Sequence, residues 1–161
     1  MNTEPLVTSG SELSEGETRS LKLWVVLARA YSAVKSHSLA DIERHGLTVG
    51  EFGILETLYH KGPMLLGEVQ RRILVSSGGI TYLVDRLEQK GLVERRECPG
   101  DRRARYAALT GDGVALIREI FPEHARCIER ALSGLSTEEQ AQAATLLRVL
   151  GLNATALEPR G

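Results

Sequence analysis

The sequence predicts a mainly α-helical fold with one small β-hairpin. Aromatic residues make up only 4% of the chain, and the abundance of Leu, Ala, Val, Glu and Arg favours helices packed by aliphatic side chains. Apolar residues recur at helical spacing in six segments, which capping residues, glycines and prolines separate. A single basic segment has apolar residues in the pattern of two short strands around a turn with Pro and Gly.

Size and composition place the chain among soluble proteins of one domain with helical extensions. It has 161 residues, of which 42% are hydrophobic and 25% charged. No run approaches the roughly 20 apolar residues of a membrane-spanning helix. Neither a secretory signal nor a disulfide framework is apparent, since the two cysteines are only Cys98 and Cys127. We expect a cytoplasmic protein that does not contact a membrane.

The N-terminal part is predicted to be a tail followed by a long helix. Residues 1–17 contain four acids and no Lys or Arg, which predicts a disordered tail. A helical pattern from Arg19 to His45 defines a segment over 18–47, about 40 Å long. Its polar strip is narrow and consists of Lys22, Arg29 and Ser36. A helix with so much apolar surface needs cover from several sides, so we interpret 18–47 as a dimerisation helix.

Three shorter helices follow. Thr48 and Glu51 have capping-box spacing, and the helix that they begin ends at Lys61-Gly62-Pro63. A short helix is predicted over 67–74, with Val69 and Ile73 turned inward. The third covers 77–90, where Ser76 is the expected N-cap and Gly91 the residue after the C-cap.

The helix over 77–90 has one packing face and one free face. Its inward sector is apolar and consists of Ile80, Leu83, Val84 and Leu87. Its outward sector consists of Gly78, Thr81, Tyr82, Asp85 and Gln89. The first turn is small and rich in hydrogen-bonding groups, as the close approach of a helix to base edges requires. Gly78 and Gly79 each lower helix propensity by about 1 kcal/mol, and they serve either such an approach or only local packing.

The hairpin and the C-terminal helices complete the pattern. Strands are predicted over 92–95 and 104–109, around a turn with Pro99-Gly100-Asp101. Thr110 caps a helix to about Leu132. Ser136 and Glu139 have capping-box spacing and begin a last helix that ends near Gly151. We interpret 111–151 as C-terminal dimerisation helices and 152–161 as a tail.

Charge is distributed unevenly along the chain. The total is −1, but residues 61–105 carry a net charge of +4. Residues 95–105 hold five arginines against two acids, a local basic patch that attracts a phosphate backbone. Arginines at a hairpin tip enter a narrow minor groove or pair with the phosphates beside it. Alone, the charge run also fits an ordinary solvated surface.

The order of helix, short helix, capped helix and basic hairpin predicts a winged helix-turn-helix DNA-binding domain over 48–110. We call the helix over 77–90 the recognition helix and the hairpin the wing. Asp101 is expected to orient a wing arginine through a charge-assisted hydrogen bond. The predicted DNA-binding residues are Ser76, Ser77, Gly78, Gly79, Thr81, Tyr82, Arg86, Arg95, Arg96, Arg102, Arg103 and Arg105.

The segment LGEVQRRILVSSGGITYLVDRLEQKGLVERRECPGDRRARYAALT, residues 66–110, resembles the MarR family of bacterial transcription regulators. The resemblance rests on the stretch Ser76–Val93 and on four later residues, Asp101, Arg103, Leu109 and Thr110. With the flanking helices it extends over about 19–151. The sequence departs from the family at Leu66, where a capping Thr or Ser is common, so a phosphate contact by a cap hydroxyl is not expected there.

The resemblance implies a homodimer whose first and last two helices intertwine, with two winged domains on a pseudo-palindromic duplex. It also implies that Arg103 enters the minor groove. The residues that it places at the major groove are Ser77, Gly79, Thr81 and Tyr82. Family members commonly release DNA on sensing a small aromatic acid, a phenol or an oxidant.

Candidate sensing residues lie near the junction of the first two helices. An effector pocket is expected among Trp24, Tyr31, His37, His45 and Phe52, although each also fits an ordinary packing role. Cys98 is a candidate redox sensor because nearby arginines favour the thiolate. The alternative is an unreactive surface thiol.

Other functional classes find less support in the sequence. It contains no G-x-S-x-G, P-loop, H-E-x-x-H or C-x-x-C motif, and its four histidines share no ligand spacing. We therefore expect no enzyme activity, no cofactor and no metal. A winged-helix module that binds protein is the alternative, but such a module has no need of five wing arginines. The expected function is a MarR-type repressor that binds a DNA operator as a homodimer and is released by an aromatic ligand or an oxidant.

Overall fold

The computed structural model describes residues 13–73, 77–98 and 101–157. The fold is mainly α-helical with a small antiparallel sheet in the order β1-β3-β2, so the predicted fold class is confirmed. The elements are α1 (Glu15–Arg44), α2 (Val49–Lys61), β1 (Met64–Leu65), α3 (Leu66–Ile73), α4 (Ser77–Gln89), β2 (Val93–Cys98), β3 (Asp101–Leu109), α5 (Gly111–Ala131) and α6 (Thr137–Ala156).

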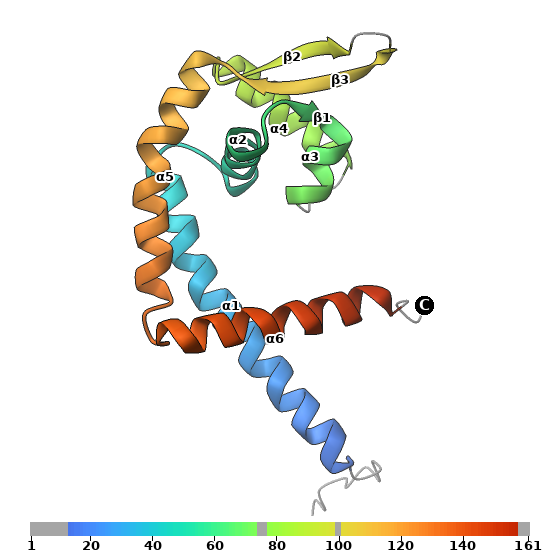
Figure 1. The fold of residues 1–161 in the computed structure, drawn as a ribbon, viewed down its shortest axis with the longest axis vertical. Helices are drawn as coiled ribbons and strands as arrows, with labels where there is room; N and C mark the ends of the chain where they lie inside the picture. Colours follow the sequence, from blue (N-terminus) through green and yellow to red (C-terminus); the bar gives the residue numbers. More distant parts are fainter. Residues whose placement is uncertain (1–12, 74–76, 99–100, 158–161) are drawn as a thin grey trace, which may run out of the picture.

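The molecule has a packed end and an extended end (Figure 1). Helices α2, α3 and α4 pack under the sheet at one end. The helix α5 leads away from this end alongside the C-terminal half of α1. The N-terminal half of α1 and all of α6 extend beyond the packed part. The arrangement separates a winged helix-turn-helix unit from two long helices with little cover of their own.

The core lies where α2, α4 and α5 meet the sheet. Ile54, Leu55, Val84, Leu87 and Ile117 are fully buried. On α4 the predicted inward sector is confirmed, because Ile80, Val84 and Leu87 are buried and Leu83 packs against them. Thr81, Tyr82, Asp85 and Gln89 are exposed on the opposite side. Burial of one face therefore fixes which face of α4 is free.

In the middle of the chain, capping residues and glycines end the helices where the sequence predicts. Thr48 and Glu51 form a capping box at the start of α2. Gly62 and Gly91 have φ values of 77° and 70°, a conformation that favours glycine. After α4, the N–H of Leu92 donates to the carbonyl of Leu87, and the N–H of Gly91 donates to that of Glu88. These two bonds are the Schellman motif, and they turn the chain from α4 into the wing.

Both predicted tails are shorter than expected. Residues 15–17 are helical because Ser14 and Glu17 form a capping box that begins α1. At the other end α6 continues through Gly151 to Ala156, so residues 152–156 are helical as well. The strand β1 was not predicted, since two residues are too few to show an alternating pattern. Residues 1–12, Ser76, the turn residues 99–100 and residues 158–161 lie outside the described residues.

Across the described ranges 13–73, 77–98 and 101–157, no helix combines the length and apolar character that crossing a membrane requires.

Candidate nucleic-acid interface

The free face of α4 is a polar surface beside a hollow. Thr81 and Tyr82 are exposed on it, and the Tyr82 side chain is 59% exposed. The hollow has a volume of about 520 Å³ and is lined by Tyr82, Asp85, Arg86, Gln89 and Lys90. Such a surface offers hydrogen-bond donors and acceptors without an apolar cover, as base-edge contacts need. The side chain of Ser77 and the exposure of Gly78 lie outside what the structure describes, so their contacts with DNA stay predictions.

A buried carboxylate of α2 pairs with two cations at the C-terminal end of α4, Arg86 within the helix and Lys90 directly after it. Glu51 Oε1 lies 3.1 Å from Arg86 Nε and 2.9 Å from Lys90 Nζ. Burial raises the pKa of Glu51, but the backbone N–H of Thr48 and the charge of Lys90 outweigh it, so the pKa lies below its ordinary value. Arg86 was predicted to contact DNA. In the structure its Nε faces the buried carboxylate of Glu51 while 37% of its side chain is exposed, and a contact with DNA stays a prediction.

Arg95 joins the wing to α4. Its Nη2 lies 2.7 Å from Asp85 Oδ1, and Nη1 pairs with Glu88. The backbone N–H of Arg95 also donates to Glu88 Oε1 at 2.9 Å, and Nη2 lies 3.4 Å from the carbonyl oxygen of Thr81. Two acids of α4 therefore share the one positive charge of Arg95, and these contacts hold the wing against α4.

The outer part of the wing carries paired arginines. Arg96 Nη2 lies 2.6 Å from Glu94 Oε1 on the same strand. Arg105 lies opposite Glu97 in the strand register, and its Nη1 lies 2.9 Å from Glu97 Oε1. Both arginines are exposed, so a phosphate can compete with these acids. The side chains of Cys98, Asp101, Arg102 and Arg103 lie outside the described residues, and their roles stay predictions.

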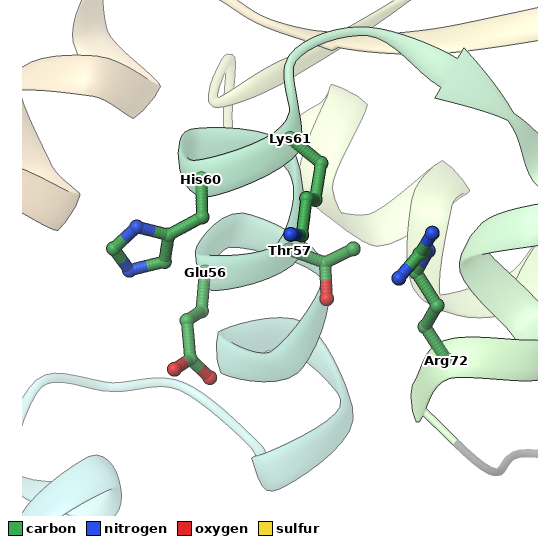
Figure 2. A pocket seen from close by; sticks show the side chains of 5 residues that line it. All are labelled: Glu56, Thr57, His60, Lys61 and Arg72. Carbon is green, nitrogen blue, oxygen red and sulfur yellow. The ribbon is translucent and has the colours of Figure 1, made fainter.

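A second charged hollow of about 240 Å³ lies between α2 and α3. Figure 2 shows Lys61 and Arg72 pointing toward Thr57, while His60 turns away. The ring of His60 meets that of Phe121 at 5.0 Å. Within the ranges that the structure describes, Lys61 and Arg72 have no ion-pair partner. They add unpaired positive charge to the winged domain, outside the wing.

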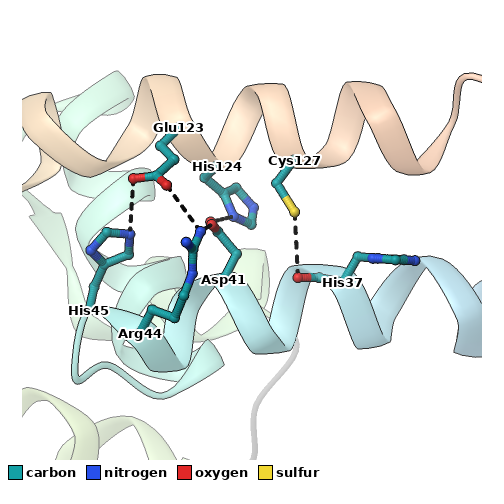
Figure 3. Close-up of polar contacts among 7 residues, drawn as sticks. All are labelled: His37, Asp41, Arg44, His45, Glu123, His124 and Cys127. Carbon is teal, nitrogen blue, oxygen red and sulfur yellow. Dashed lines mark hydrogen bonds and ion pairs between the residues drawn. The ribbon is translucent and has the colours of Figure 1, made fainter.

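A polar cluster joins α1 to α5 (Figure 3). Asp41 is buried, its Oδ2 lies 2.9 Å from His124 Nδ1, and it also pairs with Arg44. Arg44 Nη2 lies 3.1 Å from Glu123 Oε1, and His45 Nε2 lies 3.8 Å from Glu123 Oε2. These contacts fix the C-terminal end of α1 beside the winged domain.

The predicted effector residues are spread along α1 and the start of α2. Phe52 is buried, with its ring 4.5 Å from that of His124, and His45 faces Glu123. The carbonyl of His37 accepts a hydrogen bond from Cys127 Sγ at 3.6 Å. Trp24 and Tyr31 are exposed on α1. About 30 Å of helix separates Trp24 from His45, so a pocket that both residues line needs a second copy of the chain.

Sequence reasoning missed the acids that organise this surface. Glu51 was identified only as a capping residue, and Asp85 only as a member of the outward face. The spacing of Asp85 and Glu88 places both acids on one side of α4, which was the available signal for a basic partner. Nothing in the local pattern shows that this partner is Arg95.

Comparisons with known proteins agree with this geometry. A family model described as MarR family matches residues 45–104. The HTH-type transcriptional regulator MhqR of Bacillus subtilis (strain 168) is 46% identical over 136 residues, which cover 84% of this chain and 94% of MhqR. The HTH-type transcriptional repressor MdtR of the same strain is 30% identical over 118 residues, 73% of this chain and 76% of MdtR.

A solved structure extends the agreement to the fold. It is that of Bordetella bronchiseptica BpsR, whose DNA binding is described as regulated by 6-hydroxynicotinic acid. BpsR is 26% identical, with a TM-score of 0.73 over 81% of this chain and 98% of BpsR. With its winged helix-turn-helix and its similarity to MhqR over most of both sequences, the chain belongs to the MarR family of transcriptional regulators.

Proposed function

We propose that the protein is a homodimeric repressor that binds a pseudo-palindromic DNA operator. The observation that carries this proposal is the joining of the exposed polar face of α4 to the basic wing by Arg95. A recognition helix and a wing in fixed relation fit a major groove and the adjacent minor groove of one duplex. The repressor role is supported by MdtR, and DNA binding by BpsR. The proposed binding to DNA supports a cytoplasmic location.

The long helices supply the surface for a dimer. Apolar side chains are exposed on α1 and α6, far more than a single copy can cover: Leu21, Leu23, Trp24, Val25, Val26 and Tyr31 on α1, and Leu146, Leu147, Val149, Leu150 and Leu152 on α6. Contiguous exposed apolar surface on this scale marks an interaction site. A second copy provides a symmetric cover, and it brings two winged domains to one duplex.

A small effector is proposed to release the DNA. BpsR supports this, because an aromatic acid regulates its DNA binding. The proposed pocket is completed by the partner copy, so that Trp24 or Tyr31 of one chain approaches His45 and Phe52 of the other. Cys98 is retained as an alternative sensor of oxidants. Ligand binding in the pocket or oxidation of Cys98 would change the distance between the two winged domains, so that they no longer fit the two half-sites of the operator.

The test begins by selecting, from a pool of random-sequence DNA duplexes, those that the full chain binds. Binding of the full chain to the selected duplexes is then measured. We expect footprinting to show two half-sites with centres about 34 Å apart on one face of the duplex. Binding should weaken steeply as salt rises, because arginines displace counterions from the phosphates. A pool without enrichment, together with binding that salt does not affect, would reject DNA recognition and favour a protein-binding module.

A further inference from the structure

We infer that Glu51 is a positioning residue for the recognition of DNA. It aligns the Tyr82 side chain through Arg86, and it keeps the cations of Arg86 and Lys90 away from the DNA phosphates. The inference rests on the proposed function, since it takes α4 to be the helix that reads DNA. Glu51 itself does not touch DNA in this account. It acts from the protein interior on the side chains of α4.

The contacts of Glu51 reach two helices. Its side chain is fully buried at the start of α2, and Oε2 accepts the backbone N–H of Thr48 at 2.7 Å. Oε1 faces Arg86 of α4 at 3.1 Å and Lys90, the residue that follows α4, at 2.9 Å. One carboxylate thus caps α2 and pairs with two cations at the C-terminal end of α4. The capping role of Glu51 needs only a hydrogen-bond acceptor. It does not account for the negative charge that faces Arg86 and Lys90.

The position of Tyr82 depends on this network. Arg86 Nη1 lies 3.3 Å from Tyr82 Oη, and the guanidinium lies 5.8 Å from the centroid of the Tyr82 ring. Arg86 therefore touches Glu51 at one end and Tyr82 at the other. Tyr82 is exposed on the free face of α4. The buried carboxylate thereby fixes the direction in which an exposed aromatic side chain points.

The same network limits nonspecific attraction. Arg86 and Lys90 are partly exposed, with side chains 37% and 31% accessible, so each is within reach of solvent. While Glu51 is ionised, a buried carboxylate competes with phosphates for both cations. Lys90 Nζ also donates to the carbonyl of Gly46 at 3.0 Å. Removing the negative charge of Glu51 would therefore have two effects. It would free Arg86 and Lys90 to pair with phosphates, and it would leave the Tyr82 side chain without its fixed partner.

The test is Glu51→Gln, which keeps the shape and the cap acceptor but removes the charge. Affinity is measured for the selected duplex and for a scrambled duplex of the same length, between about 50 and 200 mM salt. We expect affinity for the selected duplex to fall about tenfold, while affinity for the scrambled duplex is unchanged or higher. The salt dependence should steepen by about one unit of slope, because a freed cation pairs with a phosphate.

The matched control is Glu56→Gln on the same helix, since Glu56 has no ion-pair partner among the described residues. It should behave like the wild type on both duplexes. If Glu51→Gln weakens both duplexes equally with an unchanged slope, the role of Glu51 is only structural and the inference is wrong. Unchanged discrimination in Glu51→Gln would reject it as well, while leaving the proposed function intact.

Arg86→Gln keeps the inference testable if the buried variant does not fold. Arg86 is 37% exposed, and in this variant Lys90 still faces Glu51 at 2.9 Å, so the buried carboxylate keeps one cation. We expect reduced discrimination between the two duplexes with the wild-type salt slope. A slope shallower by about one unit would mean that Arg86 itself contacts a phosphate, which would overturn the inference. A wild-type protein that does not discriminate at all would instead reject the proposed function.

Discussion

Arg95 of β2 and Asp85 of α4 form an ion pair with 2.7 Å between Nη2 and Oδ1. Glu88, one turn further along α4, pairs with the same guanidinium. The Arg95 side chain is 23% exposed, whereas those of Asp85 and Glu88 are 50% and 31% exposed, so solvent screens the contact with Asp85 more than the contact with Glu88. Arg95 therefore links the wing to the recognition helix at two successive turns.

Arg95→Gln should weaken DNA binding without loss of a phosphate contact. The charge of Arg95 is already matched by two acids, so its removal changes the orientation of the wing more than the number of counterions released. We expect a several-fold loss of affinity for the selected duplex and an unchanged salt slope in a gel-shift titration. Arg96→Gln is the contrasting variant, since Arg96 is exposed and pairs with Glu94 of its own strand: it should leave the wing in place and reduce the salt slope by about one unit. A slope shallower by about one unit in Arg95→Gln would identify a direct phosphate contact instead.

Arg103→Ala should have the opposite signature. The wing tip is predicted to enter the minor groove, where an arginine neutralises phosphate charge whatever the sequence. We expect weaker binding to all duplexes and a salt slope reduced by about one unit. Thr81→Ala, on the exposed face of α4, should mainly relax base preference. If Arg103→Ala leaves both affinity and slope at the wild-type level, the assignment of the wing arginine is wrong.

Local signals were sufficient to predict most of the elements. The capping boxes that begin at Thr48 and Ser136 each span only four consecutive residues. The two faces of α4 follow from helical periodicity alone. Two helix ends differ from the prediction. Helix α1 begins earlier because Ser14 and Glu17 form a capping box, and α6 continues past Gly151 because an interior glycine costs only about 1 kcal/mol.

Contacts between elements were beyond local reasoning. Glu51 lies 35 residues from Arg86 in sequence, and its cap role already accounts for an acid at that position. The partner of Arg95 depends on how the wing folds back over α4, which neither periodicity nor charge pattern specifies. The sequence therefore predicts the exposed face of α4 and the basic wing, whose contacts with DNA stay predictions, but it does not reveal the acids that pair with Arg86 and Arg95.

Gly113 is required by a close approach between α5 and the start of the wing. A Cβ at this position would lie 2.0 Å from the carbonyl oxygen of Leu92. Gly113→Ala should lower the free energy of unfolding by about 1–3 kcal/mol or more, measured by urea denaturation at one protein concentration. Gly111→Ala is the control in the same helical turn, because its Cβ would meet nothing within 4 Å. Equal stability of the two variants would contradict the close approach.

The stability that Asp41 contributes should depend on pH in the acid range. Burial raises the pKa of Asp41, but hydrogen bonds with His124 and Arg44 outweigh it, so the pKa is below its ordinary value of about 3.9. As pH falls, the unfolded chain takes up this proton first. The stabilisation is therefore complete above about pH 4 and is lost as pH falls through the lowered pKa.

Asp41→Asn tests this dependence. It should reduce the free energy of unfolding by about 1.5–3 kcal/mol at pH 6, and the difference from wild type should shrink below about pH 4. Glu43→Gln, an exposed acid on the same helix, serves as the control with little effect. A difference that stays constant down to pH 2.5 would mean that the Asp41 carboxylate charge does not stabilise the junction of α1 and α5.

Trp24→Glu should dissociate the proposed dimer. Trp24 lies on the exposed apolar surface of α1, and burying an unpaired carboxylate against a partner costs several kcal/mol. We expect sedimentation velocity to show a monomer at concentrations where the wild type is dimeric, and footprinting to lose simultaneous protection of two half-sites. Lys22→Glu is the control, since Lys22 belongs to the polar strip of the same helix and stays in solvent on association. A Trp24→Glu protein that remains dimeric with wild-type affinity would show that this part of α1 lies outside the dimer interface.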